Sequence, residues 1–188
     1  MIRALLLLLV LSPELLAQQV EHKSYTSKVL GRDLKYDVYL PPSYATSPAK
    51  KYPVLYFLHG LFEDETRWST RGQTDQIMNR MIAEGKIGEF IVAMPYGGTS
   101  FYTNTRDGSE KWEDAIVTEF IPMIESNYRV NATRTTRGIS GTSMGGYGAL
   151  KIAMKHPDMF GSASAHRDRK STRLNSSHLK LSRMPSSA

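Results

Sequence analysis

The sequence predicts an α/β domain in which a mainly parallel sheet is flanked by helices, and three observations lead to this fold class. The run Tyr52–Leu58 is continuously apolar, as expected of a strand that is covered on both faces in a parallel sheet. Amphipathic helical patterns at Thr74–Glu84 and Trp112–Asn127 alternate with such strands. A glycine-rich corner around Ser143 joins a short strand to a further helix. In this architecture ligands bind beyond the carboxyl ends of the strands, so we expect the functional site at that edge.

The composition excludes several kinds of site. The chain has 188 residues, which suggests one domain, and it contains no cysteine, so disulfides and thiolate metal sites are excluded. Of the formal net charge of +6, five positive charges fall in residues 167–188, where six Lys and Arg residues stand against one Asp. The rest of the chain is nearly neutral, so a nucleic-acid partner is not expected. No metal or other cofactor is implied.

The N-terminal segment, residues 1–17, is predicted to be a signal peptide. Arg3 precedes the apolar run Ala4–Leu11, and Ala17 supplies a small residue at the position where a signal peptidase would cut. A retained membrane helix is the alternative, but the apolar run is shorter than the stretch of about 18 residues that marks a spanning helix. We therefore expect a secreted or periplasmic protein without stable membrane insertion.

The first elements of the domain are predicted to be a hairpin, a buried strand and a helix. Apolar and polar residues alternate in Tyr25–Leu30 and Leu34–Leu40 around Gly31-Arg32-Asp33, which is typical of a hairpin with one buried face. The helix at Thr74–Glu84 is expected to end at Gly85, which would act as its C-cap. Its predicted apolar face consists of Ile77, Met78, Met81 and Ile82.

The next strand is predicted at Phe90–Met94, and the loop Pro95–Lys111 follows it. The loop is long, aromatic and polar, so we expect it to line the site rather than merely connect two elements. In the second helical pattern, Pro122 predicts a kink. Glu113 and Asp114 lie near the start of that pattern, where they are interpreted as favourable charges at a helix N-terminus rather than as catalytic acids.

The stretch Arg137–Leu150 contains the pattern G-x-S-x-G, as Gly141-Thr142-Ser143-Met144-Gly145. Such a corner holds its serine in a strained, exposed turn, while the two glycines let strand and helix approach closely. An ordinary glycine-rich turn is the alternative. The apolar Ile139 before the corner and an amphipathic run after it, ending at His156-Pro157, favour the strand-corner-helix arrangement, so Ser143 is the candidate nucleophile. The apolar members of that run are Tyr147, Leu150, Ile152, Ala153 and Met154.

The character of the sequence changes after His166. A small-residue strand is predicted at Phe160–Ala165, but residues 167–188 are rich in Ser, Lys and Arg and lack helical or strand periodicity. This tail resembles K-S-T-R-L-N-S-S-H read-through peptides, which arise when vector or adaptor sequence is translated in frame; a disordered basic tail is the alternative. We therefore expect a domain at residues 18–166, followed by an unstructured, non-native tail.

Four motifs together resemble a known family. They are Y-P-V-L-Y-F-L-H-G-L from Tyr52, I-V-A-M-P-Y-G-G from Ile91, W-E-D from Trp112 and G-T-S-M-G-G-Y-G-A-L from Gly141. Over about Tyr25–His166 the chain resembles the putative-esterase branch of the α/β-hydrolases. That branch includes esterase D (S-formylglutathione hydrolase), feruloyl and tributyrin esterases, and mycolyltransferases. The resemblance implies an α/β-hydrolase fold, which we expect to be incomplete at the C-terminus.

The resemblance also implies roles for particular residues. Ser143 would be the acyl-forming nucleophile, and the main-chain N–H groups of Leu61 and Met144 would form the oxyanion hole. These two donors would meet the negative charge that develops on the carbonyl oxygen. The counterpart of His59 shapes the oxyanion loop in this family, so His59 is expected to be structural rather than a base.

The catalytic acid and base are expected to be missing from this chain. In α/β-hydrolases the triad runs Ser, then Asp or Glu, then His, with the last two on later strand ends. None of the candidates after Ser143 fits that placement, and we therefore expect an N-terminal portion of the domain that is inactive as written. The candidates considered are Asp158, Asp168, His156, His166 and His178.

The expected function is that of a serine esterase, which hydrolyses a carboxylic ester through an acyl-enzyme on Ser143. One alternative is an acyltransferase of the mycolyltransferase type, which would pass the acyl group to a sugar or glycerol hydroxyl. The other is a noncatalytic relative that binds a carbohydrate or a lipid. The expected partner is a small-molecule or carbohydrate-linked ester, and the sequence specifies neither the acyl group, the alcohol nor the oligomeric state.

Overall fold

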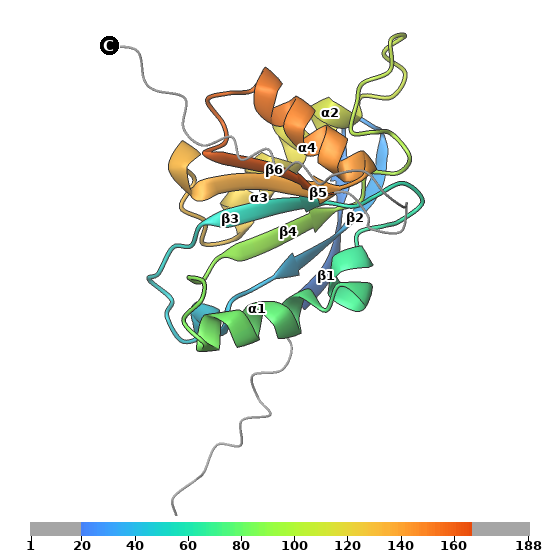
Figure 1. The fold of residues 1–188 in the computed structure, drawn as a ribbon. Helices are drawn as coiled ribbons and strands as arrows, with labels where there is room; N and C mark the ends of the chain where they lie inside the picture. The colour runs from blue at the N-terminus through green and yellow to red at the C-terminus, as the bar shows by residue number, and fades with distance from the viewer. Residues whose placement is uncertain (1–19, 167–188) are drawn as a thin grey trace, which may run out of the picture.

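The computed structural model describes residues 20–166, which form one six-stranded sheet with helices on both faces (Figure 1). The predicted signal peptide (1–17) and the predicted tail (167–188) lie outside the described residues. No helix within the described part is long and apolar enough to cross a membrane. The strands are β1 (Val20–Ser27), β2 (Arg32–Tyr39), β3 (Val54–Leu58), β4 (Ile91–Pro95), β5 (Arg137–Thr142) and β6 (Ser162–His166). The helices are α1 (Thr74–Ala83), α2 (Trp112–Asp114), α3 (Ile121–Asn127) and α4 (Met144–Lys155), with short helical turns η2 (Pro42–Tyr44), η3 (Arg67–Arg71), η4 (Ala115–Phe120) and η5 (Arg134–Thr136).

The strands follow one another across the sheet in the order β1-β2-β4-β3-β5-β6. Strand β3 is parallel to both of its neighbours, β4 and β5, and β6 is parallel to β5. Only the hairpin β1–β2 and the contact of β2 with β4 are antiparallel in the described sheet. The predicted mainly parallel sheet is therefore confirmed, and the loops that follow β3, β4 and β5 all leave from the same edge.

Strand β3 divides the core into two layers. Its side chains at Val54, Tyr56 and Leu58 pack in a cluster that includes residues of α3 and α4. Phe57 points to the other face, where its ring stacks on Trp68 of η3 at a centroid distance of 3.8 Å. Figure 1 shows α1 on this second side of the sheet and α4 on the first. Because both faces are covered, a continuous apolar run is what this strand requires.

The N-terminal hairpin is confirmed, but its bounds differ from the prediction. Strand β1 begins at Val20 instead of Tyr25, and Arg32 and Asp33, which were expected in the turn, belong to β2. Gly31 alone provides the left-handed backbone that the turn needs, with a φ of +65°. The early part of β1 escaped prediction because its middle residues are mostly exposed and polar, which leaves no alternating pattern.

The remaining strands and α1 lie within two residues of their predicted bounds. Two shifts reach two residues: β6 begins at Ser162 instead of Phe160, and Tyr52 makes an isolated parallel bridge with Val130 instead of starting β3. Pro53 separates this bridge from β3, because proline has no N–H to continue the ladder of hydrogen bonds. Gly85 follows α1 with a φ of +65°, as expected of a C-cap glycine.

The predicted helix Trp112–Asn127 is present as three consecutive segments, α2, η4 and α3. The middle segment, η4, is a π-helical turn, and Pro122 lies in the first turn of α3 immediately after it. Proline lacks an N–H, and in a regular helix its ring clashes with the carbonyl group four residues earlier. The wider π-helical turn of η4 relieves this strain, which we expected to produce a kink.

Three apolar side chains were assigned to buried helix faces and are instead exposed: Ile77 on α1, and Tyr147 and Met154 on α4. The buried face of α4 is made largely of small residues, including Gly145, Gly146, Gly148 and Ala149. Ile152 of the predicted apolar run is buried as expected, but counting apolar residues misplaced Tyr147 and Met154, since the close packing of this helix depends on residues with little or no side chain.

Candidate active site

Ser143 stands at the corner between β5 and α4. Its backbone has φ 52° and ψ −113°, a conformation that a residue with a Cβ atom rarely adopts. Its side chain is exposed, and its main-chain N–H donates a hydrogen bond of 2.9 Å to the carbonyl oxygen of His166. The predicted strained corner is therefore present, and it presents a serine hydroxyl at the carboxyl edge of the parallel strands.

The two glycines of the corner are required by close contacts. A Cβ atom on Gly141 would lie 2.4 Å from the carbonyl carbon of Gly145 and 2.8 Å from the carbonyl oxygen of Leu58. A Cβ atom on Gly145 would lie 2.3 Å from that same oxygen and 2.6 Å from the carbonyl oxygen of His59. Both sets of distances are shorter than real Cβ contacts, so neither position accepts a side chain without a backbone shift.

The loop that follows β3 lies against the serine corner. Leu58 pairs with Gly141 in the sheet, and a Cβ atom on Gly60 would lie 3.5 Å from the carbonyl oxygen of Thr142. Leu61 follows in this loop, and Met144 begins α4. Within residues 20–166, no hydrogen bond is formed by the main-chain N–H of either Leu61 or Met144. Both N–H groups predicted for the oxyanion hole therefore remain able to donate a hydrogen bond to a ligand oxygen.

His59 is buried, and both of its ring nitrogens are engaged by the main chain. Its Nε2 accepts a hydrogen bond of 2.9 Å from the N–H of Gly97, so Nε2 is unprotonated. The proton then resides on Nδ1, which donates to the carbonyl oxygen of Gly60 at 2.8 Å. Burial lowers the pKa of His59, which favours this neutral form. The ring therefore joins the loop after β3 to the loop after β4, in agreement with the structural role inferred from sequence.

Tyr102 is a residue of this site that sequence reasoning missed. Its side chain is fully buried, and its hydroxyl accepts a hydrogen bond of 3.0 Å from the main-chain N–H of His59. The ring fills the space between two glycines, because Cβ atoms on Gly97 and Gly148 would lie only 2.2 Å and 2.7 Å from it. The loop Pro95–Lys111 thus packs into the site through Tyr102 and holds the loop after β3 in place.

We expect Tyr102→Phe to reduce the free energy of unfolding by about 1–3 kcal/mol. The phenylalanine ring still fills the gap between the glycines, but the buried N–H of His59 loses its partner, and an unsatisfied buried donor carries that cost. Urea unfolding curves of the variant are compared with those of Tyr147→Phe, the matched control, because the side chain of Tyr147 is exposed. A Tyr102→Phe protein as stable as the control would contradict the assigned role.

Glu113 is also part of the support for the site. Its carboxylate is buried and forms ion pairs with Lys151 at 2.8 Å and Lys155 at 2.6 Å, both on α4. Burial raises the pKa of Glu113, but the hydrogen bonds from the two lysines outweigh burial and lower it overall. Lys151 continues the network to the hydroxyl of Thr103 at 2.7 Å. Glu113 therefore links α2, α4 and the loop after β4. This role is additional to the predicted effect of its charge at a helix N-terminus.

The contacts recorded for the described histidine rings are with residues other than Ser143. His22 bonds through Nδ1 to Asp37 at 2.6 Å, and the other oxygen of Asp37 accepts a hydrogen bond from Ser69. In this trio the carboxylate separates the hydroxyl from the imidazole, so His22 cannot deprotonate Ser69. The ring of His156 faces Glu113, and that of His166 lies beside Phe57. Within residues 20–166, no histidine ring is hydrogen-bonded to Ser143 and no cluster of acidic residues and histidines could hold a metal ion.

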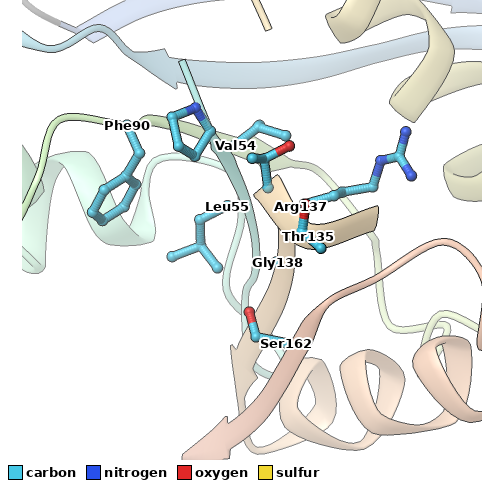
Figure 2. Close-up of a pocket in the computed structure, with 9 residues that line it drawn as sticks. Val54, Leu55, Phe90, Thr135, Arg137, Gly138 and Ser162 are labelled. Atoms are coloured by element: carbon cyan, nitrogen blue, oxygen red, sulfur yellow. The ribbon is translucent and has the colours of Figure 1, made fainter. Parts of the chain in front are cut away.

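Two pockets lie at opposite edges of the sheet. One, of about 270 Å³, lies at the amino ends of β3, β5 and β6, where Val54, Gly138 and Ser162 line it (Figure 2). Ser143 lies at the other end of these strands. The second, of about 620 Å³, lies between the start of β2 and the loop after β4, with Arg32 and Trp112 among its walls. Ser143 is not among the residues that line either of these two pockets.

Comparisons with known proteins agree with this arrangement. The chain matches the family described as "Putative esterase" over residues 27–171. It is 36% identical over 148 residues to the endo-1,4-beta-xylanase/feruloyl esterase of Xylanibacter ruminicola, which covers 76% of this chain and 20% of that protein. It is 32% identical over 158 residues to the S-formylglutathione hydrolase of Arabidopsis thaliana, covering 74% of this chain and 53% of the relative. A solved structure of a ferulic acid esterase is similar with a TM-score of 0.71 and 39% identity, covering 75% of this chain and 55% of that one.

The chain therefore spans less than two thirds of each of these relatives. Within the matched part, the predicted α/β-hydrolase fold is confirmed by the similar solved structures and by the sheet described above. The family match covers both the loop after β3 and the serine corner. This chain belongs to the putative esterase family of the α/β-hydrolases.

Proposed function

We propose that this domain hydrolyses a carboxylic ester through an acyl-enzyme on Ser143. The observation that carries the proposal is the backbone of Ser143, whose φ and ψ hold an exposed hydroxyl between β5 and α4. Backbone strain of this kind concentrates at functional sites, where the surrounding structure maintains it. Membership of an esterase family supports the same class of reaction.

The proposed reaction has two steps. Ser143 Oγ attacks the carbonyl carbon of the ester and passes its proton to a base, while the carbonyl oxygen becomes negatively charged. The N–H groups of Leu61 and Met144 would donate hydrogen bonds to that oxygen, and one such donor contributes about 2.7–4 kcal/mol. The bond to the alkoxy oxygen then breaks, and the alcohol leaves with the proton. Water repeats the sequence at the acyl-enzyme and releases the carboxylic acid.

The base and its orienting carboxylate are proposed to lie outside residues 20–166. The support is that the four described histidines, His22, His59, His156 and His166, have other contacts and none is hydrogen-bonded to Ser143. We call a protein that joins this domain to those two groups the complete enzyme. By itself, the chain of 188 residues is proposed to be inactive towards p-nitrophenyl acetate.

We also propose that the protein is exported and cleaved after Ala17. This proposal is supported by the sequence of residues 1–17, which lie outside the described part of the chain.

Water is proposed as the acyl acceptor. An acyltransferase would perform the same first step and differ only in the second. Product analysis of the complete enzyme with a carbohydrate acceptor present separates the two, because a transferase forms a sugar ester in place of the free acid.

Covalent labelling of the complete enzyme by a fluorophosphonate tests the nucleophile. We expect the label on the peptide that contains Ser143, because an activated serine hydroxyl displaces fluoride from phosphorus. Ser140, three residues away, is the internal control for labelling, because it is buried and its hydroxyl is hydrogen-bonded to Ser164 at 2.8 Å. A folded complete enzyme that takes up no label would support a noncatalytic binding protein instead.

A further inference from the structure

The proposed oxyanion donor Leu61 lies inside a tight turn that Glu63 closes. The main-chain N–H of Glu63 donates a hydrogen bond of 3.2 Å to the carbonyl oxygen of Gly60, so Leu61 and Phe62 are the two central residues of a β-turn. The side chain closes the turn a second time, because Oε2 of Glu63 accepts a hydrogen bond of 2.8 Å from the N–H of Gly60. Two hydrogen bonds that run in opposite directions therefore join the ends of the turn.

These contacts set the direction of the Leu61 N–H through one planar peptide group. The carbonyl group of Gly60 and the N–H of Leu61 belong to the same peptide group and point in opposite directions. The Gly60 oxygen accepts hydrogen bonds from the N–H of Glu63 and from Nδ1 of His59, at 3.2 Å and 2.8 Å. The Glu63 carboxylate holds the other side of Gly60 through its N–H. Any rotation of this peptide group would turn the N–H of Leu61 away from its present direction.

Phe62 shows that the turn must be held in place. Its φ is 62°, and the second central position of a β-turn with positive φ favours glycine. A residue with a Cβ atom keeps such a conformation only where the surroundings impose it. The ring of Phe62 is 86% exposed, so its own packing does not supply the constraint. The hydrogen bonds between Gly60 and Glu63 supply it.

Arg67 holds the carboxylate of Glu63 and balances its charge. Its Nε donates to Oε1 of Glu63 at 2.5 Å, while the other carboxylate oxygen binds Gly60. The guanidinium group lies over the ring of Trp68, at 5.2 Å from the ring centroid, and Trp68 stacks on Phe57 of β3. An uncompensated carboxylate beside the oxyanion donor would oppose the negative charge that develops in the reaction. The ion pair with Arg67 offsets that repulsion.

We propose that Glu63 is a positioning residue for the reaction, which orients the N–H of Leu61 towards the carbonyl oxygen of the ester. Glu63 acts through Gly60 and has no contact with the ester itself in this role. The inference rests on the proposed function, because it requires negative charge to develop on an oxygen bound by Leu61. An oriented donor acts mainly on that developing charge, so the loss of Glu63 should appear in kcat rather than in KM.

Steady-state hydrolysis of a p-nitrophenyl ester by the complete enzyme tests this role. Glu63→Ala should lower kcat by about 10- to 100-fold, which is less than the roughly 10²- to 10³-fold loss that follows outright removal of an oxyanion donor. KM should change little. Glu63→Gln keeps an oxygen that can accept the Gly60 N–H and should recover most of the lost rate. Glu84→Ala is the matched control, because it removes an exposed carboxylate paired with Lys86 at the end of α1, and it should keep the parental rate.

Inhibition by an aliphatic trifluoromethyl ketone separates this role from a general loss of structure. Ser143 Oγ adds to the carbonyl carbon of the ketone and its proton passes to the base, while the carbonyl oxygen becomes a charged hemiketal oxygen that Leu61 and Met144 would bind. The inhibition constant of Glu63→Ala should therefore rise by the same factor as kcat/KM falls. Glu63→Met keeps the length of the side chain without an oxygen, and it should give the same results if Glu63→Ala folds poorly.

Hydrogen exchange of the Gly60 amide tests the geometry without turnover. It is measured by NMR in the whole chain of 188 residues, and it should be faster in Glu63→Ala than in the parental chain, because the bond to the carboxylate is lost. Glu63→Gln should keep most of the protection.

Three results would overturn the inference: parental kcat in a folded Glu63→Ala enzyme, a lower kcat with an unchanged inhibition constant, or unchanged exchange at Gly60. Failure of the proposed function gives a different result, in which the parental complete enzyme neither hydrolyses the ester nor takes up a fluorophosphonate. That result would remove the role of Glu63 as well.

Discussion

Ser143→Ala should abolish ester hydrolysis by the complete enzyme. The alanine keeps the Cβ atom and so the strained backbone at φ 52°, but no oxygen remains to form the acyl-enzyme. Removal of a serine nucleophile lowers kcat by about 10⁶-fold in a well-studied protease. A residual rate of roughly 10³- to 10⁴-fold over water is expected from the oxyanion donors and from substrate binding. Steady-state hydrolysis of short p-nitrophenyl esters measures the loss.

Ser140→Ala is the matched control for this experiment. It also removes a serine hydroxyl from the same segment, but that hydroxyl is buried and bonded to Ser164. We expect it to lower stability by about 0.5–1.5 kcal/mol, the net contribution of a typical hydrogen bond, and to leave hydrolysis near the parental rate. Near-parental turnover in a folded Ser143→Ala protein would remove Ser143 from the mechanism.

Gly145→Ala should be among the most destabilising single changes in the domain. The new methyl group would lie 2.3 Å from the carbonyl oxygen of Leu58 and 2.6 Å from that of His59. Both contacts are with main-chain atoms, which cannot rotate away as a flexible side chain can. Overpacking typically costs 1–3 kcal/mol, and backbone clashes on two sides place this case at about 3 kcal/mol or more. The same displacement would move the loop that carries Leu61.

Gly88→Ala provides the control for Gly145→Ala. Nothing lies within 4 Å of a Cβ atom placed on Gly88, and this glycine has no positive φ. We therefore expect a change within about 0.5 kcal/mol, or a small gain from lower entropy of the unfolded chain. Urea unfolding of the two variants gives the comparison. Equal stabilities would mean that helix α4 is not held as closely to the end of strand β3 as the distances indicate.

The features predicted well from sequence are those that local pattern determines. Strand β3 is apolar at every position because both of its faces are covered, and the corner at Ser143 requires glycines two residues on either side. The stop at His156-Pro157 likewise follows from a residue that cannot continue a helix. In each case the residue types that produce the structure are adjacent in the chain, so the pattern is visible without knowledge of the fold.

The features that were missed depend on contacts between distant segments. Tyr102 supports the site by filling a gap between Gly97 and Gly148 and by bonding to His59, and no local periodicity records such contacts. The exposure of Tyr147 was missed for a related reason. The buried face of α4 is defined by glycines, which a count of apolar residues treats as neutral. The loop after β4 was expected to line the site, but its role in holding the loop after β3 needed the structure.

Mass spectrometry of the complete enzyme, quenched with acid within its first turnovers of a p-nitrophenyl ester, tests the central claim most directly. We expect an increase in protein mass equal to the acyl group, located by peptide mapping on Ser143, because the proposed mechanism requires this covalent intermediate. The adduct should be absent from Ser143→Ala and present in Ser140→Ala. Hydrolysis at the parental rate with no acyl adduct, or with an adduct on another residue, would contradict the account.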